Sequence, residues 1–218
     1  MGIIQRQGLK SSIISYIGVA IGVLSTMYIY PSALEILGLF RALFDASVLI
    51  GIVVMMGSSV SAVRFFPKYQ DVKTGHGGLL TWLLLVSGVG FLLFLMAFPF
   101  VRTWMVDFIF RDENMKYKDL VVYVIPLTFF LALINLLSRY ISNFKLIAIP
   151  SALEQLSIKI TLPLIVLAYL AGWINVEGVV ICIVASFALS AISMMYYLRH
   201  LGEVRLSRPL IMRDKPGL

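Results

Sequence analysis

The chain has 218 residues, of which 60% are hydrophobic and 13% are charged, and its formal net charge is +7. Soluble domains have roughly 45–50% apolar and about 25% charged residues, so these charges are too few to cover a water-soluble globule. A mean hydropathy of +0.96 indicates a surface that faces lipid. The single cysteine, Cys182, excludes an intramolecular disulfide and a cysteine-cluster metal site. We therefore expect an integral membrane protein, whose basic excess marks cytoplasmic loops rather than a nucleic-acid partner.

Six long segments contain no Asp, Glu, Lys or Arg. They are 11–34, 46–63, 77–101, 120–138, 160–176 and 178–198, with lengths of 24, 18, 25, 19, 17 and 21 residues. A membrane-spanning helix needs about 20 apolar residues, range about 17–25, whereas a barrel strand is about 10 residues of alternating polarity. The sequence therefore predicts an all-α, polytopic membrane protein with six transmembrane helices in residues 1–200. Residues 201–218 are basic and show no helical periodicity, which is typical of a tail or linker.

The Lys and Arg residues divide unequally between the two sides that six crossings would create. Thirteen fall on the side of the two termini and five on the other. Loops rich in Lys and Arg stay in the cytoplasm. Both termini are therefore expected to be cytoplasmic.

A polar stripe lies at the end of the fourth segment. It consists of Asn135, Ser138, Arg139, Ser142 and Asn143, whose spacing places all five on one face of a helix. Two interpretations are open. The stripe either lines a hydrated cavity open to the cytoplasm, or belongs to a helix that leaves the membrane among lipid headgroups, where Arg139 reaches toward water.

Further charges lie beside the second and fifth segments. Arg41 and Asp45 are four residues apart and either pair at the outer end of a helix or begin a polar seam, with Ser59 five turns further along the same face. Arg64 is either a cytoplasmic anchor or part of a cavity. Lys159, one residue before the fifth segment, either extends to the interface or reaches into a cavity.

Motifs for enzymatic chemistry are missing from the sequence. The glycine cluster 74–78 lacks the lysine of a phosphate-binding loop. His76 and His200 are far apart and have no neighbouring metal ligands. We therefore expect no catalytic residues, no metal, no cofactor and no nucleic-acid partner.

The first third of the chain resembles a known family. The stretches that carry the resemblance are 1–8 (MGIIQRQG), 13–18 (IISYIG), 38–45 (GLFRALFD) and 62–69 (AVRFFPKY). They are similar to the start, the second helix and the first cytoplasmic loop of bacterial oligosaccharide flippases, also called polysaccharide biosynthesis proteins. The resemblance covers about residues 1–75 and is nearest to the versions found in Bacteroidota. Beyond residue 75 it rests on helix number and topology.

The resemblance implies membership of the multidrug/oligosaccharidyl-lipid/polysaccharide exporter superfamily, in which two six-helix lobes face each other across a central cavity. It implies translocation of an undecaprenyl-diphosphate-linked oligosaccharide across the bacterial inner membrane for surface polysaccharides such as lipopolysaccharide. Arg41, Arg64, Arg139 and Lys159 would then attract the diphosphate, and polar residues, among them Asp45 and Asn135, would hydrate the sugars. The partners expected are this lipid-linked substrate and membrane lipid.

Family chains carry about twelve to fourteen helices, so 218 residues would supply only the first lobe. Residues 201–218 would then lead toward a missing second lobe, and the chain is a fragment, a truncated inactive product or a lobe that pairs with another chain. Two alternative functions stay open. A multidrug exporter of the same superfamily would be expected to carry acidic residues in its cavity that attract cations. It is disfavoured because the first helix has no charge between Lys10 and Glu35. A non-transporting scaffold would use the same charges as anchors.

Overall fold

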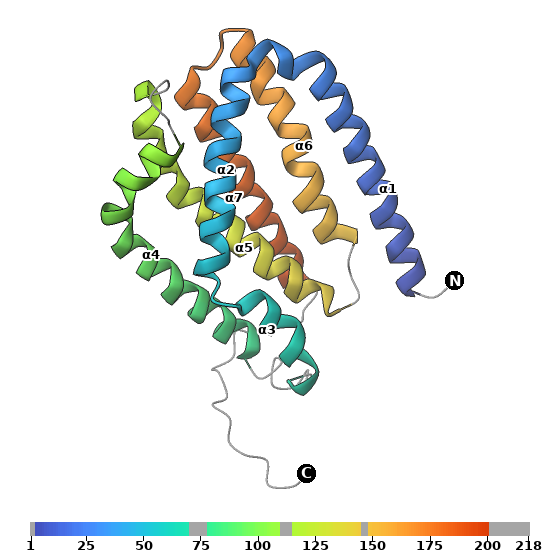
Figure 1. Ribbon diagram of the computed structural model, residues 1–218. Helices are drawn as coiled ribbons and strands as arrows, with labels where there is room; N and C mark the ends of the chain where they lie inside the picture. Colours follow the sequence, from blue (N-terminus) through green and yellow to red (C-terminus); the bar gives the residue numbers. More distant parts are fainter. Residues whose placement is uncertain (1–2, 70–77, 110–114, 145–147, 201–218) are drawn as a thin grey trace, which may run out of the picture.

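A computed structural model describes residues 3–69, 78–109, 115–144 and 148–200 (Figure 1). This part of the chain is helical apart from short turns and contains no strand, which confirms the all-α prediction there. The tail expected at 201–218 lies outside the described residues. The long helices are α1 (Ile3–Leu24), α2 (Leu34–Val54), α4 (Leu79–Ile109), α5 (Val124–Ser142), α6 (Ala148–Leu170) and α7 (Val176–His200). The short ones are the π-helix η1 (Ser25–Ile29), the 3₁₀ helices η2 (Tyr30–Ala33), η3 (Phe66–Lys68) and η6 (Met115–Tyr123), and the α-helix α3 (Ser58–Phe65).

Five helical stretches in the described residues are long and apolar enough to cross a membrane. They are Gly8–Val54, Leu79–Asp107, Tyr117–Ser142, Pro150–Leu170 and Val176–His200. The first is 47 residues long and holds both α1 and α2, which run in opposite directions on either side of η2 (Figure 1). Pro31 lies in the first turn of η2, within the first charge-free segment, 11–34. The chain is therefore a multi-pass helical protein, with five such stretches where the sequence predicts six.

The second predicted segment, 46–63, is misplaced. The helix α2 covers Leu34–Val54 and therefore begins twelve residues earlier, with Arg41 and Asp45 inside it. It ends at the turn formed by Met55, Met56 and Gly57, after which α3 begins. A search for segments without charged residues misses the start of α2 because this helix contains two charges. It keeps both exposed on one side, while Leu39, Leu43 and Ser47 are buried on the other.

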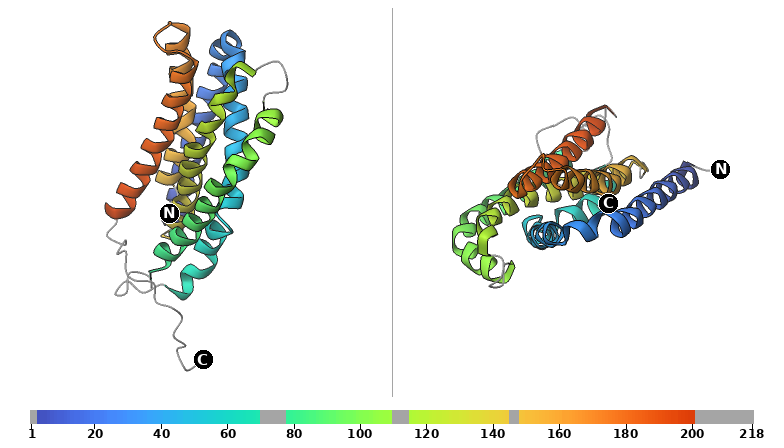
Figure 2. Two further views of the ribbon diagram at one scale, coloured as in Figure 1. Left: turned by 90° about the vertical axis from the view of Figure 1, so that its left-hand side faces the viewer. Right: turned by 90° about the horizontal axis from the view of Figure 1, so that it is seen from above.

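The long helices form a bundle with α5 at its centre. The helix α1 packs on α6, α6 on α7, α7 on α5, α5 on α2 and α2 on α4, and Figure 2 shows α1 at the edge of the bundle beside α6. Leu127, Leu137 and Ile141 of α5 are at most 1% exposed. Much of the remaining surface is apolar, as expected of helices that face lipid.

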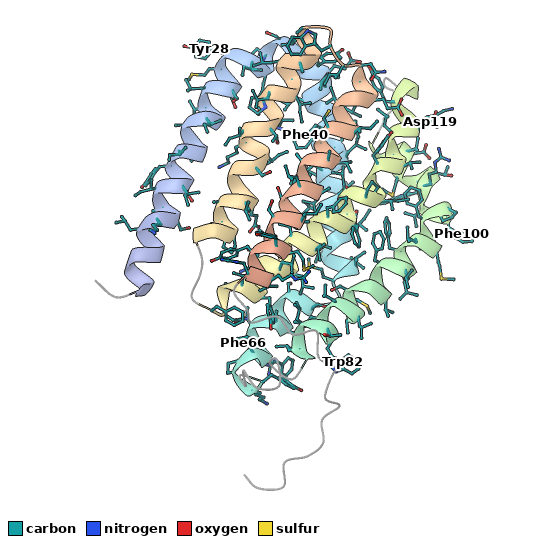
Figure 3. All side chains as sticks on the ribbon, turned by 180° about the vertical axis from the view of Figure 1, so that it is seen from behind. Tyr28, Phe40, Phe66, Trp82, Phe100 and Asp119 are labelled. Carbon is teal, nitrogen blue, oxygen red and sulfur yellow. The ribbon has the colours of Figure 1, made fainter. Side chains whose placement is uncertain are left out.

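The bundle has two distinct ends, which we call the α3 end and the η6 end. Phe66 and Trp82 lie at the α3 end, and Tyr28 and Asp119 at the η6 end (Figure 3). The first residues of α1 and the last residues of α7 both lie at the α3 end (Figure 1). The two ends of the described chain thus lie at the same end of the bundle.

Three hydrogen bonds at the η6 end connect η6 to three long helices. Tyr117 donates to Glu35 of α2 over 3.0 Å, and Tyr123 donates to Glu177 of α7 over 2.9 Å. Arg102 of α4 donates to Asp119 over 3.2 Å and forms an ion pair with it. The segment η6 therefore holds α2, α4 and α7 together at this end.

At the α3 end the helices meet through an aromatic cluster and one close backbone contact. Phe66 packs edge to face against Tyr140 and Phe144, with ring centroids 5.9 and 5.1 Å apart. Gly90 of α4 lies so close to α2 that a Cβ atom placed on it would come within 2.1 Å of the Val54 carbonyl oxygen. Only glycine allows the two backbones to approach in this way.

Candidate functional site

Two adjoining cavities lie between α2 and its neighbours. The one we call the inner cavity has a volume of about 230 Å³ and is bounded by α2, α5, α6 and α7. The one we call the basic cavity has a volume of about 560 Å³ and lies against α3, the last turn of α2 and α5. Ile52, Met55 and Asn135 line both. The two cavities therefore meet at the level of Asn135.

Two arginines from different helices line the basic cavity. Arg64 comes from the last turn of α3 and Arg139 from the last turn of α5. Both are exposed, and neither is paired with a carboxylate in the described part of the chain. Asn135 lies one helical turn from Arg139 and adds an amide group to the wall. Within the ranges that the structure describes, the cavity therefore presents two positive charges without a paired carboxylate, and a hydrogen-bonding amide.

The first turn of α3 forms another part of the wall. Gly57 precedes this helix with φ +77°, and Met56 before it also has a positive φ, +46°. No side chain caps the start of the helix, and Gly57, Ser59 and Val60 all line the basic cavity. Backbone N–H groups in the first turn of a helix carry a partial positive charge, and in α3 the first of them, that of Ser58, already donates to the Met55 carbonyl oxygen. The cavity wall therefore combines a helix N-terminus with two guanidinium groups, a combination that suits a phosphate.

The inner cavity is mostly apolar and holds one carboxylate. Phe44 and Phe187 contribute aromatic surface, and Glu154 of α6 lines the cavity. The Ser138 hydroxyl of α5 donates to Glu154 over 2.9 Å. Glu154 and Asn135 therefore bring polar groups to a space that is otherwise bounded by hydrocarbon.

Arg41 and Asp45 do not form the ion pair considered from the sequence. Both are exposed, and neither has a charged partner in the part of the chain that the structure describes. At about 100° per residue both lie within roughly 20° of Ile52 on the helical circumference of α2, and Ile52 lines the two cavities. They therefore continue the cavity-bearing face of α2 toward the η6 end.

The structure corrects the predicted register of Ser59. The sequence places it five turns after Arg41 on one helix, but the turn at Met55–Gly57 interrupts that helix, so the register does not carry across. Ser59 nevertheless lines the basic cavity because α3 brings it there.

The other two predicted positions lie elsewhere. Lys159 is near the middle of α6 rather than at the start of a span, because α6 begins at Ala148. Its side chain is half-buried, has no carboxylate partner among the described residues, and is not part of either cavity wall. Asn143 donates to the Ala62 carbonyl oxygen of α3 over 3.0 Å. The polar stripe of α5 is thus divided between the cavities and a contact with α3.

The sequence analysis does not identify two parts of the site, the start of α3 and Glu154. The start of α3 acts through backbone groups, and the signal that marks it is glycine followed by two serines at 57–59, typical of a helix start. Glu154 is only five residues from Lys159, but nothing in the sequence shows that α6 brings it to Ser138.

No three His, Cys, Asp or Glu residues within the described ranges are grouped as a metal site requires. His200 stacks on Tyr196, and His76 lies outside those ranges. We compared the chain with protein-family models, with curated proteins and with solved structures, and none of them matches.

Proposed function

We propose that the chain is one six-helix lobe of a bacterial inner-membrane transporter, with both termini cytoplasmic, that flips a lipid-linked oligosaccharide for surface polysaccharide synthesis. The observation that carries the proposal is the basic cavity lined by Arg64 and Arg139, neither of which has a carboxylate partner among the described residues. The resemblance of residues 1–75 to oligosaccharide flippases supports it independently. The protein would act without catalytic residues or a cofactor, and a second lobe would supply the opposite wall.

Electrostatics favours an anionic headgroup in the basic cavity. An unpaired charge at membrane depth is costly and persists where it faces water, protein or a ligand of opposite charge. Arginine binds phosphate oxygens through two parallel N–H donors, and the start of α3 adds backbone donors beside Arg64 and Arg139. A diphosphate would be held between α3 and α5.

Polar side chains follow the same side of the bundle from one end toward the other. Arg64 and Arg139 lie at the α3 end, Asn135 lies where the cavities meet, and Asp45 and Arg41 lie toward the η6 end. A sugar chain needs hydrogen-bond partners wherever it crosses hydrocarbon. These residues would provide such partners along its path.

Lipid-flipping in reconstituted vesicles tests the proposal, together with surface polysaccharide export in cells. Arg64→Ala and Arg139→Ala should each lower the rate at least tenfold, since a hydrogen-bonded charge contributes about 1.5–3 kcal/mol. Lysine at either position should restore part of the activity, because it keeps the charge but loses the bidentate geometry. Lys68→Ala is the matched control, because Lys68 is an exposed cation at the same end outside both cavities.

Protein abundance must be measured beside the rate, because a purely anchoring residue changes abundance or orientation and leaves activity per molecule unchanged. Unaltered export by both alanine variants at normal abundance would contradict the proposal and favour the scaffold function.

A second candidate function, export of lipophilic cations, is favoured by one observation. Glu154 places a carboxylate in the inner cavity among aromatic and aliphatic residues, and such a site attracts an apolar cation. Binding of a cationic dye that is lost in Glu154→Gln and retained in Arg64→Ala would support this function over oligosaccharide translocation.

A further inference from the structure

We infer that the turn Met55–Gly57 is a hinge about which α3 swings, and that the Asn143 side chain latches α3 against α5. The latched position is the one in this structure. It brings Arg64 and Arg139 to the same cavity, so the movement would assemble and separate the two halves of that cavity. The inference concerns motion and holds whatever the cargo is.

The backbone at the turn is held in a conformation that L-residues avoid. Met56 has φ +46° and Gly57 has φ +77°. A non-glycine residue with positive φ is uncommon, and it persists where the surrounding structure enforces it, often at switch regions. The turn directly follows the apolar stretch Gly8–Val54 and separates α2 from α3. The strained backbone at Met56 therefore lies at the junction of the two helices.

The segment before the turn is fixed. Gly90 of α4 lies against the Val54 carbonyl oxygen, and Val54 itself is buried. The last turn of α2 therefore cannot shift without moving α4. Rotation about Met56 and Gly57 would displace the segment after them, α3 and η3, against α4 and α5, on which α3 packs.

The latched position leaves a polar atom unsatisfied. The Ser58 hydroxyl, at the first position of α3, is buried and has no hydrogen-bond partner. A buried hydroxyl without a partner is unfavourable. Moving α3 would give this group access to water or to a carbonyl oxygen, which supplies a physical reason for a second position.

The short helix α3 packs against both α5 and α4, and its polar contact with α5 is the Asn143 hydrogen bond to Ala62. Phe66, just beyond the end of α3, packs against Tyr140 and Phe144. Because the basic cavity is lined by both α3 and α5, an anion bound there would bridge the two helices and favour the latched position.

Distance measurements between spin labels on the full chain in lipid nanodiscs test the hinge. In a Cys182→Ser background, one label pair replaces Lys68 of η3 and Ile192 of α7, and a control pair replaces Leu49 of α2 and Ile192. All three labelled positions are exposed. Asn143→Ala should raise the population of a second Lys68–Ile192 distance about fivefold, the factor equivalent to about 1 kcal/mol for a neutral hydrogen bond.

Matched variants distinguish loss of the Asn143 hydrogen bond from a general destabilisation of the bundle. Ser142→Ala should leave the distances unchanged, because among the described residues the Ser142 hydroxyl donates to the Arg139 carbonyl oxygen of its own helix and to no residue of α3. Gly57→Ala should cause the same shift as Asn143→Ala, since alanine disfavours the latched φ. Gly38→Ala, with open space around it and an ordinary φ, should not.

Identical Lys68–Ile192 distances in Asn143→Ala, Gly57→Ala and the unmodified chain would overturn the hinge, as would an equal change in the Leu49–Ile192 pair. Inorganic pyrophosphate should return Asn143→Ala to the latched distance, and Arg64→Gln should remove that effect. A shift in Asn143→Ala that pyrophosphate does not reverse would support the hinge and contradict the diphosphate-binding function.

Discussion

The close contact between α4 and α2 makes Gly90→Ala a sharp test of the packing. A Cβ atom at position 90 would lie 2.1 Å from the Val54 carbonyl oxygen and 3.0 Å from its carbonyl carbon. Ordinary van der Waals contact begins at about 3.4 Å, so the two backbones must separate by about 1 Å. Overpacking of this kind costs about 1–3 kcal/mol, and because the atoms in the way are backbone, no side-chain rotation relieves it.

Gly88→Ala is the matched control in the same helix. A Cβ atom there meets nothing within 4 Å, and Gly88 lines a small cavity of about 100 Å³. Alanine is favoured over glycine in a helix interior by about 1 kcal/mol. We therefore expect Gly88→Ala to be neutral or slightly stabilising and Gly90→Ala to be destabilising by up to about 2 kcal/mol after the same propensity gain.

Thermal unfolding of the purified protein in detergent, followed by circular dichroism, measures the difference between the two variants. Gly90→Ala should unfold at a clearly lower temperature than Gly88→Ala. Equal unfolding temperatures for both would refute the close approach of α4 to Val54.

Two further predictions concern the ends of the bundle. In a Cys182→Ser background, an impermeant maleimide added to intact cells should label Trp173→Cys in the turn after α6 and spare Lys68→Cys until the membrane is permeabilised; the reverse pattern would invert the proposed orientation. Phe66→Ala should destabilise the protein by about 3–5 kcal/mol, as expected for a buried ring, whereas Phe100→Ala, at a ring that is 87% exposed, should change unfolding little. Similar losses for both would show that Phe66 is not part of the core.

The helical bundle could be predicted from the sequence because apolar runs of membrane-spanning length have few alternative structures. The two ends of α2 could not be predicted in this way. Cutting at charges assumes that charges lie outside the spans, and α2 breaks this assumption by holding Arg41 and Asp45 on its exposed side. The turn after α2 depends on the left-handed φ of Gly57. Glycine can adopt this φ but does not have to, and tertiary contacts decide whether it does.

The candidate site was partly predictable for a related reason. Asn135 and Arg139 lie one turn apart within the unbroken helix α5, so helical periodicity is enough to bring them together. Arg64 joins them only through the change of direction between α2 and α3, which periodicity does not describe. Glu154 reaches the site through the contact between α5 and α6. Local sequence patterns do not predict contacts between helices.

The hydrogen bonds of η6 make the two ends of the bundle mechanically unequal. The helices α2, α4 and α7 share one restraint through Glu35, Arg102 and Glu177, which all bond to η6. Any tilt of these helices therefore pivots near that restraint, and displacement grows with distance from it. For α7, with 25 residues and a length of roughly 38 Å, a tilt of about 5° moves the far end by roughly 3 Å. The displacement from such a tilt is therefore largest at the α3 end, where Arg64 and Arg139 lie.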